Sequence, residues 1–191
     1  IITQIAVTTY QAYNIYPGFI ATGSWKNGKS LYTGFDPKVP LDAADEYKSF
    51  EAREVSFNRP YYPDNGNIYN SAGQFFVWEY HMVRWLEKQG FDVTYITDVD
   101  AHSNAANFSS GKHKVFLNSG HDEYWTWEMR SNLTAARDRS NFPMHLAFLG
   151  SNDCYWQIRL EPSVNNPQNL YSTIVSYKTH TTDPFPSGDP V

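Results

Sequence analysis

The sequence of 191 residues lacks several features that would assign it to a class of protein at once. It has a single cysteine, Cys154, so no internal disulfide can form. No apolar run approaches the roughly 20 residues that a membrane-spanning helix needs, and we expect no membrane partner. The formal net charge of −5 gives no electrostatic reason to expect a nucleic-acid partner. The absences therefore exclude a disulfide scaffold and argue against membrane and nucleic-acid binding.

The two ends of the sequence lack familiar signals as well. The chain begins at Ile1 without a methionine or a signal peptide, and it stops in a run rich in Pro and Gly over residues 183–191. We expect a fragment of a longer protein that forms a single α/β domain over residues 1–191. The expected macromolecular partners are the other domains of that longer chain or further copies in a homo-oligomer. No targeting segment indicates a compartment.

Aromatic residues, in contrast, are abundant. They make up 17% of the chain, with 14 Tyr and 6 Trp, and apolar residues make up 41%. Tyr and Trp combine a large apolar area with a hydrogen-bonding end, so this excess favours packed aromatic surfaces and polar-tipped pockets.

The hydrophobic pattern predicts alternating strands and helices. Strands are expected over residues 1–9, 53–59, 91–97, 114–118, 145–149 and 171–177, and helices over residues 71–89 and 126–139. Ser71 is placed to cap the first helix, and Gly90 follows its end. Two strand–helix–strand units demand a mostly parallel sheet with right-handed crossovers. We therefore predict a three-layer α/β domain with a flavodoxin-like sheet and long loop insertions over residues 15–34 and 36–51.

The stretch over residues 114–125, KVFLNSGHDEYW, is the most informative part of the chain. An apolar strand turns at Ser119 and Gly120 and then delivers charged side chains just before a helix. Because parallel strands end at the same edge of a sheet, polar groups that follow different strands should meet there. The side chains expected at this edge are Tyr13, Asp98, His121, Glu123 and Asn152.

Each of these residues also has an ordinary interpretation. Glu123 suits the first turn of a helix, where the macrodipole favours an acid. His121 can bond backbone within a turn, and Asn152 is a common loop-forming residue. Asp98 and Asp100 are more typical of a solvated turn than of a pair of catalytic acids.

A series of short motifs in fixed order resembles a known family. The motifs are Gln11-Ala12-Tyr13-Asn14, Lys29-Ser30-Leu31-Tyr32, Val55-Ser56-Phe57-Asn58-Arg59-Pro60-Tyr61, Arg84-Trp85-Leu86-Glu87, Thr97-Asp98-Val99-Asp100, Gly120-His121-Asp122-Glu123-Tyr124-Trp125, Gly150-Ser151-Asn152, Tyr155-Trp156 and Arg159. Over roughly residues 8–161 they resemble the C-terminal catalytic domain of the N,N-dimethylformamidase large (beta) subunit. That resemblance implies a class I glutamine amidotransferase-like fold without the catalytic cysteine of those enzymes.

The resemblance also implies an activity, a metal and its ligands. It implies a metal-dependent amidohydrolase that acts on a small-molecule amide and carries one mononuclear iron, Fe³⁺, held by two tyrosines and a glutamate. Glu123 corresponds to the glutamate ligand, and Tyr13 and Tyr32 are the expected tyrosines, with Tyr61 as the substitute for either. His121, Glu123 and Asn152 are the expected catalytic groups. Phenolate and carboxylate are hard oxygen donors that suit ferric iron.

Two other hypotheses stay open at this point. One is a cysteine hydrolase that uses Cys154, although this residue lies past the end of a strand rather than in an elbow that exposes a nucleophile. We expect Cys154 to be a buried, unreactive thiol beside Tyr155 and Trp156. The other is a non-catalytic, aromatic-rich binding module that keeps the fold without the chemistry.

Overall fold

The computed structural model describes residues 1–16, 19–21, 24–26, 28–32, 51–61, 71–109 and 111–178. The elements in chain order are β1 (Ile2–Ile5), α1 (Val7–Ala12), β2 (Phe19–Ala21), β3 (Ser24–Lys26), β4 (Glu54–Ser56), η1 (Ser71–Gly73), α2 (Gln74–Trp78), α3 (Tyr80–Gln89), β5 (Thr94–Thr97), α4 (Asp98–Ser103), α5 (Ala106–Ser109), β6 (Val115–Asn118), β7 (Tyr124–Thr126), α6 (Trp127–Arg137), β8 (His145–Phe148), β9 (Trp156–Glu161) and β10 (Thr173–Val175). The expected excursion over residues 36–51 lies almost wholly outside the described residues. None of the helices in the described ranges is long and apolar enough to cross a bilayer.

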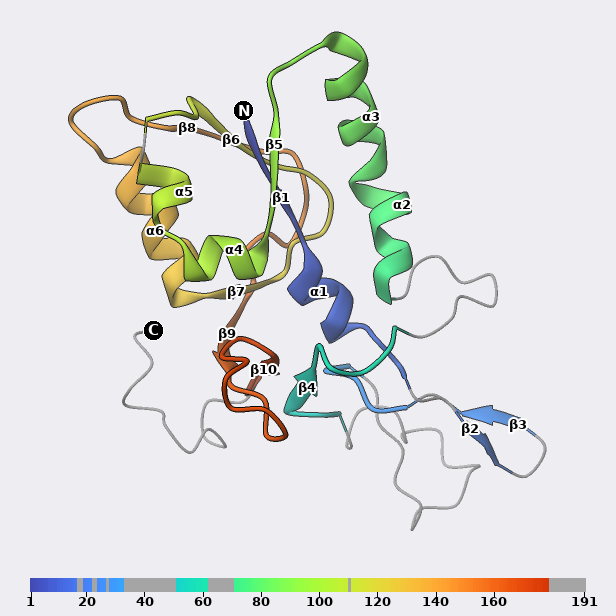
Figure 1. Ribbon diagram of the computed structural model, residues 1–191. Helices are drawn as coiled ribbons and strands as arrows, with labels where there is room; N and C mark the ends of the chain where they lie inside the picture. Colours follow the sequence, from blue (N-terminus) through green and yellow to red (C-terminus); the bar gives the residue numbers. More distant parts are fainter. Residues whose placement is uncertain are drawn as a thin grey trace.

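A parallel sheet of four strands organises the fold (Figure 1). Its strand order is β5-β1-β6-β8, and every neighbouring pair is parallel. Strand β1 comes first in the chain, β5 is then added on one side of it, and β6 and β8 are added on the other side. The direction of strand addition therefore reverses between β1 and β6. The prediction of an α/β domain with a parallel sheet is confirmed.

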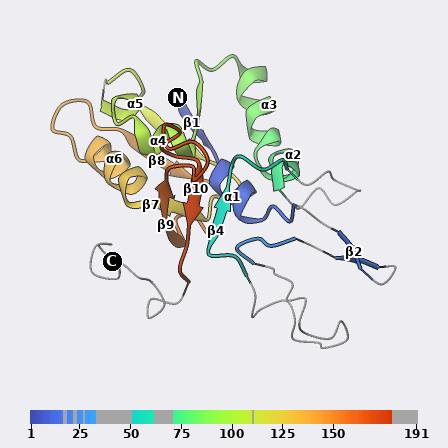
Figure 2. The same cartoon turned by 60° about the horizontal axis from the view of Figure 1, so that its bottom comes forward.

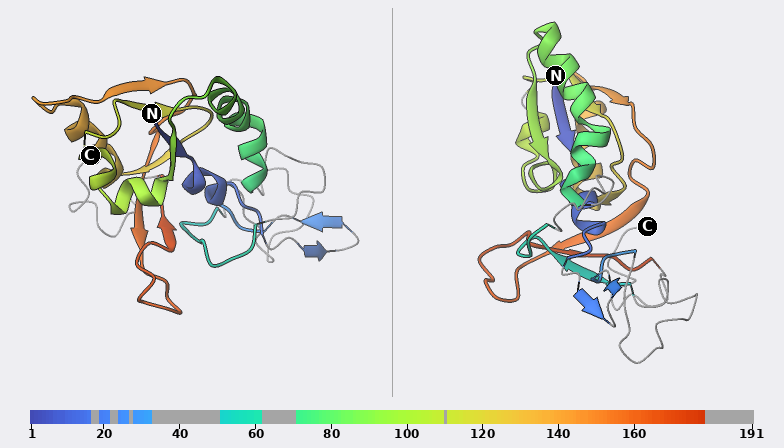
Figure 3. Two further views of the ribbon diagram at one scale, coloured as in Figure 1. Left: turned by 45° about the horizontal axis from the view of Figure 1, so that its top comes forward. Right: turned by 90° about the vertical axis from the view of Figure 1, so that its right-hand side faces the viewer.

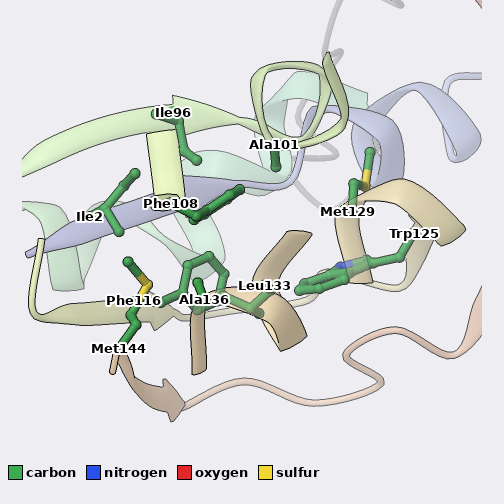
Figure 4. Packing of buried hydrophobic residues seen from close by; sticks show 10 residues of the cluster. All are labelled: Ile2, Ile96, Ala101, Phe108, Phe116, Trp125, Met129, Leu133, Ala136 and Met144. Atoms are coloured by element: carbon green, nitrogen blue, oxygen red, sulfur yellow. The ribbon is translucent and has the colours of Figure 1, made fainter. Parts of the chain in front are cut away.

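Helices lie on both sides of this sheet (Figures 1 and 3). On one side, α4, α5 and α6 cover a core of apolar side chains, which Figure 4 shows from close by. Ile2, Ile96 and Phe116 come from three neighbouring strands and meet Met129 and Leu133 of α6. On the other side run α2 and α3, from which Leu86 is buried. Trp78 and Glu79, at the junction of these two helices, pack against Gly120.

A second, mixed sheet completes the described part of the fold. Its order is β4-β10-β9-β7, with β7 and β9 parallel and the other pairs antiparallel. Figure 2 shows this sheet beside α1. Ala12, Leu31, Tyr124, Ile158 and Ile174 form a second buried cluster here. Strand β7 begins directly after the His121–Glu123 turn, so this turn lies at the junction of the two sheets.

Local signals in the sequence explain where several helices begin and end. Thr97 and Thr126 cap α4 and α6, each accepting a hydrogen bond from the backbone N–H three residues later. Gly90 ends α3 with φ of +73°, a left-handed conformation that glycine adopts without steric cost. Met129, Leu133 and Ala136 are the buried residues of α6, as its periodicity predicts.

The structure corrects three predicted features and adds strands that the sequence did not indicate. The strand expected over residues 1–9 ends at Ile5, and α1 follows, because its Thr-rich segment turns to bond the neighbouring strand ends. The single helix expected over residues 71–89 is a 3₁₀ turn followed by α2 and α3, and Ser71 lies inside that turn with φ of +58° rather than capping a helix. The hairpin of β2 and β3 and the strands β7 and β9 were not predicted.

Gly120 and Gly150 approach each other closely beyond the ends of β6 and β8. A Cβ atom at Gly150 would lie 2.2 Å from the carbonyl oxygen of Gly120. We expect Gly150→Ala to lower the free energy of unfolding by about 2–3 kcal/mol, because backbone rather than a flexible side chain must move. Urea denaturation measures this loss. Gly90→Ala is the matched control, since it has no atom within 4 Å but a positive φ, and we expect a loss of about 1–2 kcal/mol. Equal losses in the two variants would contradict the close approach.

Candidate metal and catalytic site

Glu123 lies at the centre of the candidate site, in the turn that joins β6 to β7. Its backbone N–H donates to Thr9 Oγ1 at 3.0 Å, and its carbonyl accepts from Trp156 N at 2.8 Å. These two bonds tie the turn to α1 on one side and to β9 on the other. The Glu123 side chain is almost fully buried, so its carboxylate must find partners within the protein.

Two tyrosines supply those partners. Tyr13 directly follows α1, and its hydroxyl donates to Glu123 Oε2 at 2.9 Å. Tyr32 donates to the other oxygen, Oε1. The two tyrosine rings are stacked with centroids 4.3 Å apart. Leu31 N donates to Ala12 O at 3.0 Å, and this bond between neighbouring segments brings the rings together. Two phenols and one carboxylate therefore converge on one point.

His121 and Asn152 lie beside this point. His121 Nε2 is 3.2 Å from Glu123 Oε2 and 3.1 Å from Asn152 Nδ2. The close approach follows from a parallel bridge between His121 and Ser151, which extends the register of β6 and β8. Asn152 has φ of +57°, a conformation that Asn tolerates better than most residues. A protonated imidazole would donate to Glu123 through Nε2, whereas a neutral one can accept from Asn152, so His121 can hold or release a proton here.

Burial raises the pKa of both tyrosines. Removal from water is the largest cause, and the neighbouring phenol and Glu123 add to it for Tyr13. For Tyr32 the hydrogen bond to Glu123 is the second cause that raises the pKa. Both hydroxyls therefore stay protonated near neutral pH unless a cation displaces the protons. A bound cation would replace these two protons and face three oxygen donors.

Lys178 is a neighbour of the site that the motifs did not indicate. Its Nζ lies 3.4 Å from the centroid of the Tyr32 ring and donates to Leu31 O at 2.8 Å. Burial lowers the pKa of Lys178, and Glu123 opposes that effect. A cation over the ring face favours negative charge on the phenol oxygen. No spacing signal marks Lys178, because it reaches the site only through the pairing of β10 in the second sheet.

A buried polar network beneath the site contains Asp98, for which the prediction of a solvated turn is wrong. Asp98 is fully buried and accepts from Gln4 Nε2 at 2.8 Å, from Thr8 N at 2.8 Å and from Thr8 Oγ1 at 2.6 Å. Gln4 Nε2 also donates to Asp122 Oδ2 at 2.7 Å, and Asn118 Nδ2 donates to the same oxygen at 2.6 Å. The network fixes the start of α1 against the ends of β5 and β6. Asp100 instead forms the capping box of α4 with Thr97.

Cys154 is exposed, and the prediction of a buried thiol is wrong. It lies two residues after Asn152 and has φ of +58°. Partial desolvation still raises its pKa, and the charged groups that act on it are Arg130, Asp122 and Asp153 rather than a histidine. A thiol with a raised pKa and no imidazole among these groups is a poor nucleophile, which argues against a cysteine hydrolase.

The structure thus gathers Tyr13, Tyr32, His121, Glu123 and Asn152, and separates the remaining candidates. Asp98 lies in the network below, and Tyr61 is absent from the described partners of Glu123. The five residues lie beyond the carboxyl ends of β1 and β6, where the strand order reverses. Ligands of open α/β sheets commonly bind at such a switch point. No group of three or more His, Cys, Asp or Glu side chains in the described ranges is placed to share an ion, so any metal site here depends on the phenols.

Comparison with known proteins shows the family of the chain. The family described as N,N-dimethylformamidase beta subunit-like, C-terminal, matches residues 1–190. The chain belongs to this family. The N,N-dimethylformamidase beta subunit of Alcaligenes sp is 29% identical to it over 90 residues, which cover 45% of this chain and 11% of that protein. The chain thus spans only a small part of that relative's length, and the family resemblance expected from the motifs is confirmed.

Proposed function

We propose that this chain is an amide hydrolase domain in which Tyr13, Tyr32 and Glu123 hold one ferric ion. The observation that carries the proposal is the meeting of two phenols on one buried carboxylate, one phenol on each oxygen. Two phenolates and a carboxylate are hard donors, and together they offset the charge of a trivalent ion. The family membership and the similarity to a dimethylformamidase beta subunit support the amide as substrate.

The strand order of the parallel sheet supports a more specific description of the fold. The order β5-β1-β6-β8 is the second, first, third and fourth strand of the sheet along the chain, which is the order of the flavodoxin-like fold. We infer a three-layer domain similar to class I glutamine amidotransferases. In those enzymes a cysteine performs the chemistry, whereas here the turn that follows β6 carries His121, Asp122 and Glu123.

The side chains around the proposed ion suit the hydrolysis of an amide. Ferric iron bound there would polarise the amide carbonyl and lower the pKa of a water molecule. Asn152 Nδ2, beside His121, can donate a hydrogen bond to the amide oxygen as negative charge develops on it. His121 Nε2 can accept the proton that the attacking water loses and return it to the departing amine. Lys178 favours the ionised form of Tyr32. The products are a carboxylic acid and an amine.

The reaction is tested with N,N-dimethylformamide and a measurement of released dimethylamine. We expect release by the iron-loaded protein and little by the iron-free protein. Asn152→Ala should lower kcat by roughly 10²–10³-fold with the iron content unchanged, because it removes a donor aimed at the developing charge. Cys154→Ser should leave the rate unchanged. Loss of all activity in a folded, iron-loaded Cys154→Ser variant would contradict the proposal and favour the cysteine hydrolase.

The relative's name also suggests that the chain acts together with other subunits. That protein is a beta subunit, and the match covers only 11% of it. We therefore propose that this domain acts with other domains of a longer chain or with other subunits.

A further inference from the structure

A cavity of about 510 Å³ opens beside His121 on the side of the sheet that α2 and α3 cover. Its walls include Trp78, Met82 and Leu149, and its polar side chains are His81, Ser119, His121 and Ser151. Tyr13, Tyr32 and Glu123, which hold the proposed ion, do not line this cavity, whereas His121 beside them does. The cavity is therefore a separate space that shares one wall with the candidate site.

The apolar walls are unusually open to solvent. Trp78 and Leu149 have 44% and 60% of their surface exposed, and both line the cavity. Exposed large apolar side chains are common singly, but two that flank one concave space offer an apolar ligand surface to contact. The volume lies within the range of pockets that enclose drug-sized molecules.

The backbone of the cavity floor is held by glycines. A Cβ at Gly120 would lie 2.8 Å from Trp78 Cβ, and Gly150 packs against the carbonyl of Gly120. These contacts fix the floor and the tryptophan wall relative to His121. The cavity is thus defined by the ends of β6 and β8, the same segments that place His121 and Asn152.

His121 connects the cavity to the candidate site. Its Nε2 faces Glu123 and Asn152, while the residue also lines the cavity. Because His121 contacts Asn152 and also lines the cavity, a substrate bound beside Asn152 could extend a substituent past the imidazole into the space between Trp78 and Leu149. Dimethylformamide carries only methyl groups and cannot fill this space.

We propose that the substrate is an amide with an aromatic or branched alkyl substituent that occupies this cavity. The proposal rests on the amide hydrolase function inferred above and names its substrate class. The polar groups at the cavity wall, His81 and Ser151, permit a substituent with a hydrogen-bonding end. Trp78 and Leu149 determine the preference for an apolar group.

The test compares the binding of N-benzylformamide and N,N-dimethylformamide by isothermal titration calorimetry, on the wild-type protein and on Glu123→Gln. We expect N-benzylformamide to bind at least about tenfold more tightly, because apolar contacts of this size change affinity by that factor or more. The preference should persist in Glu123→Gln, since the cavity walls do not include Glu123. Trp78→Ala and Leu149→Ser should each remove most of it.

Trp85→Ala is the matched control, because Trp85 is a half-exposed tryptophan of α3 outside the cavity lining. This variant should keep the preference. If Trp78→Ala does not fold, Leu149→Ser carries the test alone. Equal affinity for the two amides, or an unchanged preference in Leu149→Ser, overturns the proposal even if dimethylformamide is hydrolysed. A preference that the cavity variants remove supports it even when no amide is hydrolysed, and the failure then lies with the proposed reaction.

Discussion

Glu123→Gln is expected to remove bound iron and to lower amide hydrolysis on the order of a thousandfold. The substitution keeps the size of the side chain but replaces an anionic oxygen by an amide nitrogen. Only one oxygen then remains to accept from Tyr13 or Tyr32, where two accept now. The bonds of Glu123 to Thr9 and Trp156 use backbone atoms and should persist. The variant should therefore fold, and its iron content and rate of amine release measure the effect.

Glu87→Gln is the matched control for this substitution. Glu87 is also a carboxylate that accepts a hydrogen bond from a tyrosine, Tyr95, at 2.8 Å, but it lies exposed on α3. We expect the control to keep wild-type iron content and wild-type activity. A Glu123→Gln protein that retains full iron and full activity would show that Glu123 is neither a ligand nor a catalytic group.

Glu79→Gln is expected to change how stability depends on pH. Glu79 is fully buried at the start of α3, with the Tyr10 side chain as a neighbouring hydrogen-bonding group. Burial raises the pKa of Glu79 from 4.5 to about 8. Between these two pH values the folded protein holds a proton that the unfolded chain has lost, so stability falls as pH rises. The shift corresponds to a loss on the order of 3–5 kcal/mol across that window.

The side chain in Glu79→Gln does not titrate, so this variant should lack the part of the pH dependence of stability that Glu79 causes. We expect the iron-free Glu79→Gln protein to be more stable than the wild type at pH 8, with the difference shrinking toward pH 5. Urea denaturation at a series of pH values measures it. Glu87→Gln, at an exposed position, should keep the wild-type slope. Asp122, whose pKa burial raises to about 7, contributes in the same direction and should leave a residual slope. Parallel curves for wild type and Glu79→Gln would contradict a protonated Glu79.

The sequence predicts the parallel sheet and the centre of the site because both depend on local patterns. Apolar strands such as 114–118 and 145–149 are short and well bounded, and each is followed within two residues by a glycine. The rule that polar groups gather where parallel strands end then brings His121 and Asn152 together. Tyr32 joined them only through the family resemblance, since its own segment carries no strand or helix signal.

The features that sequence patterns missed depend on tertiary contacts. The Thr-rich segment of α1 continues a strand-like pattern, yet Thr8 bonds Asp98 and Tyr124 O and so follows a helical path. The sequence around Asp98 is typical of a turn, but Gln4 and Thr8 bury its carboxylate by donating three hydrogen bonds to it. Lys178 reaches Tyr32 only because β10 pairs with β9, a pairing across the second sheet that no short motif encodes.

The most direct test of a Tyr/Tyr/Glu iron site is titration of the iron-free protein with ferric iron while the visible spectrum is recorded. We expect one iron per chain and a visible charge-transfer band, because a phenolate oxygen donates electron density into the half-filled d shell. Tyr13→Phe and Tyr32→Phe should each weaken or abolish the band, since each removes a hydroxyl bonded to Glu123. Tyr61→Phe should leave it unchanged. A protein that stays colourless and binds no iron, or a band that survives in both Tyr13→Phe and Tyr32→Phe, would contradict the proposed site and favour a non-catalytic binding module.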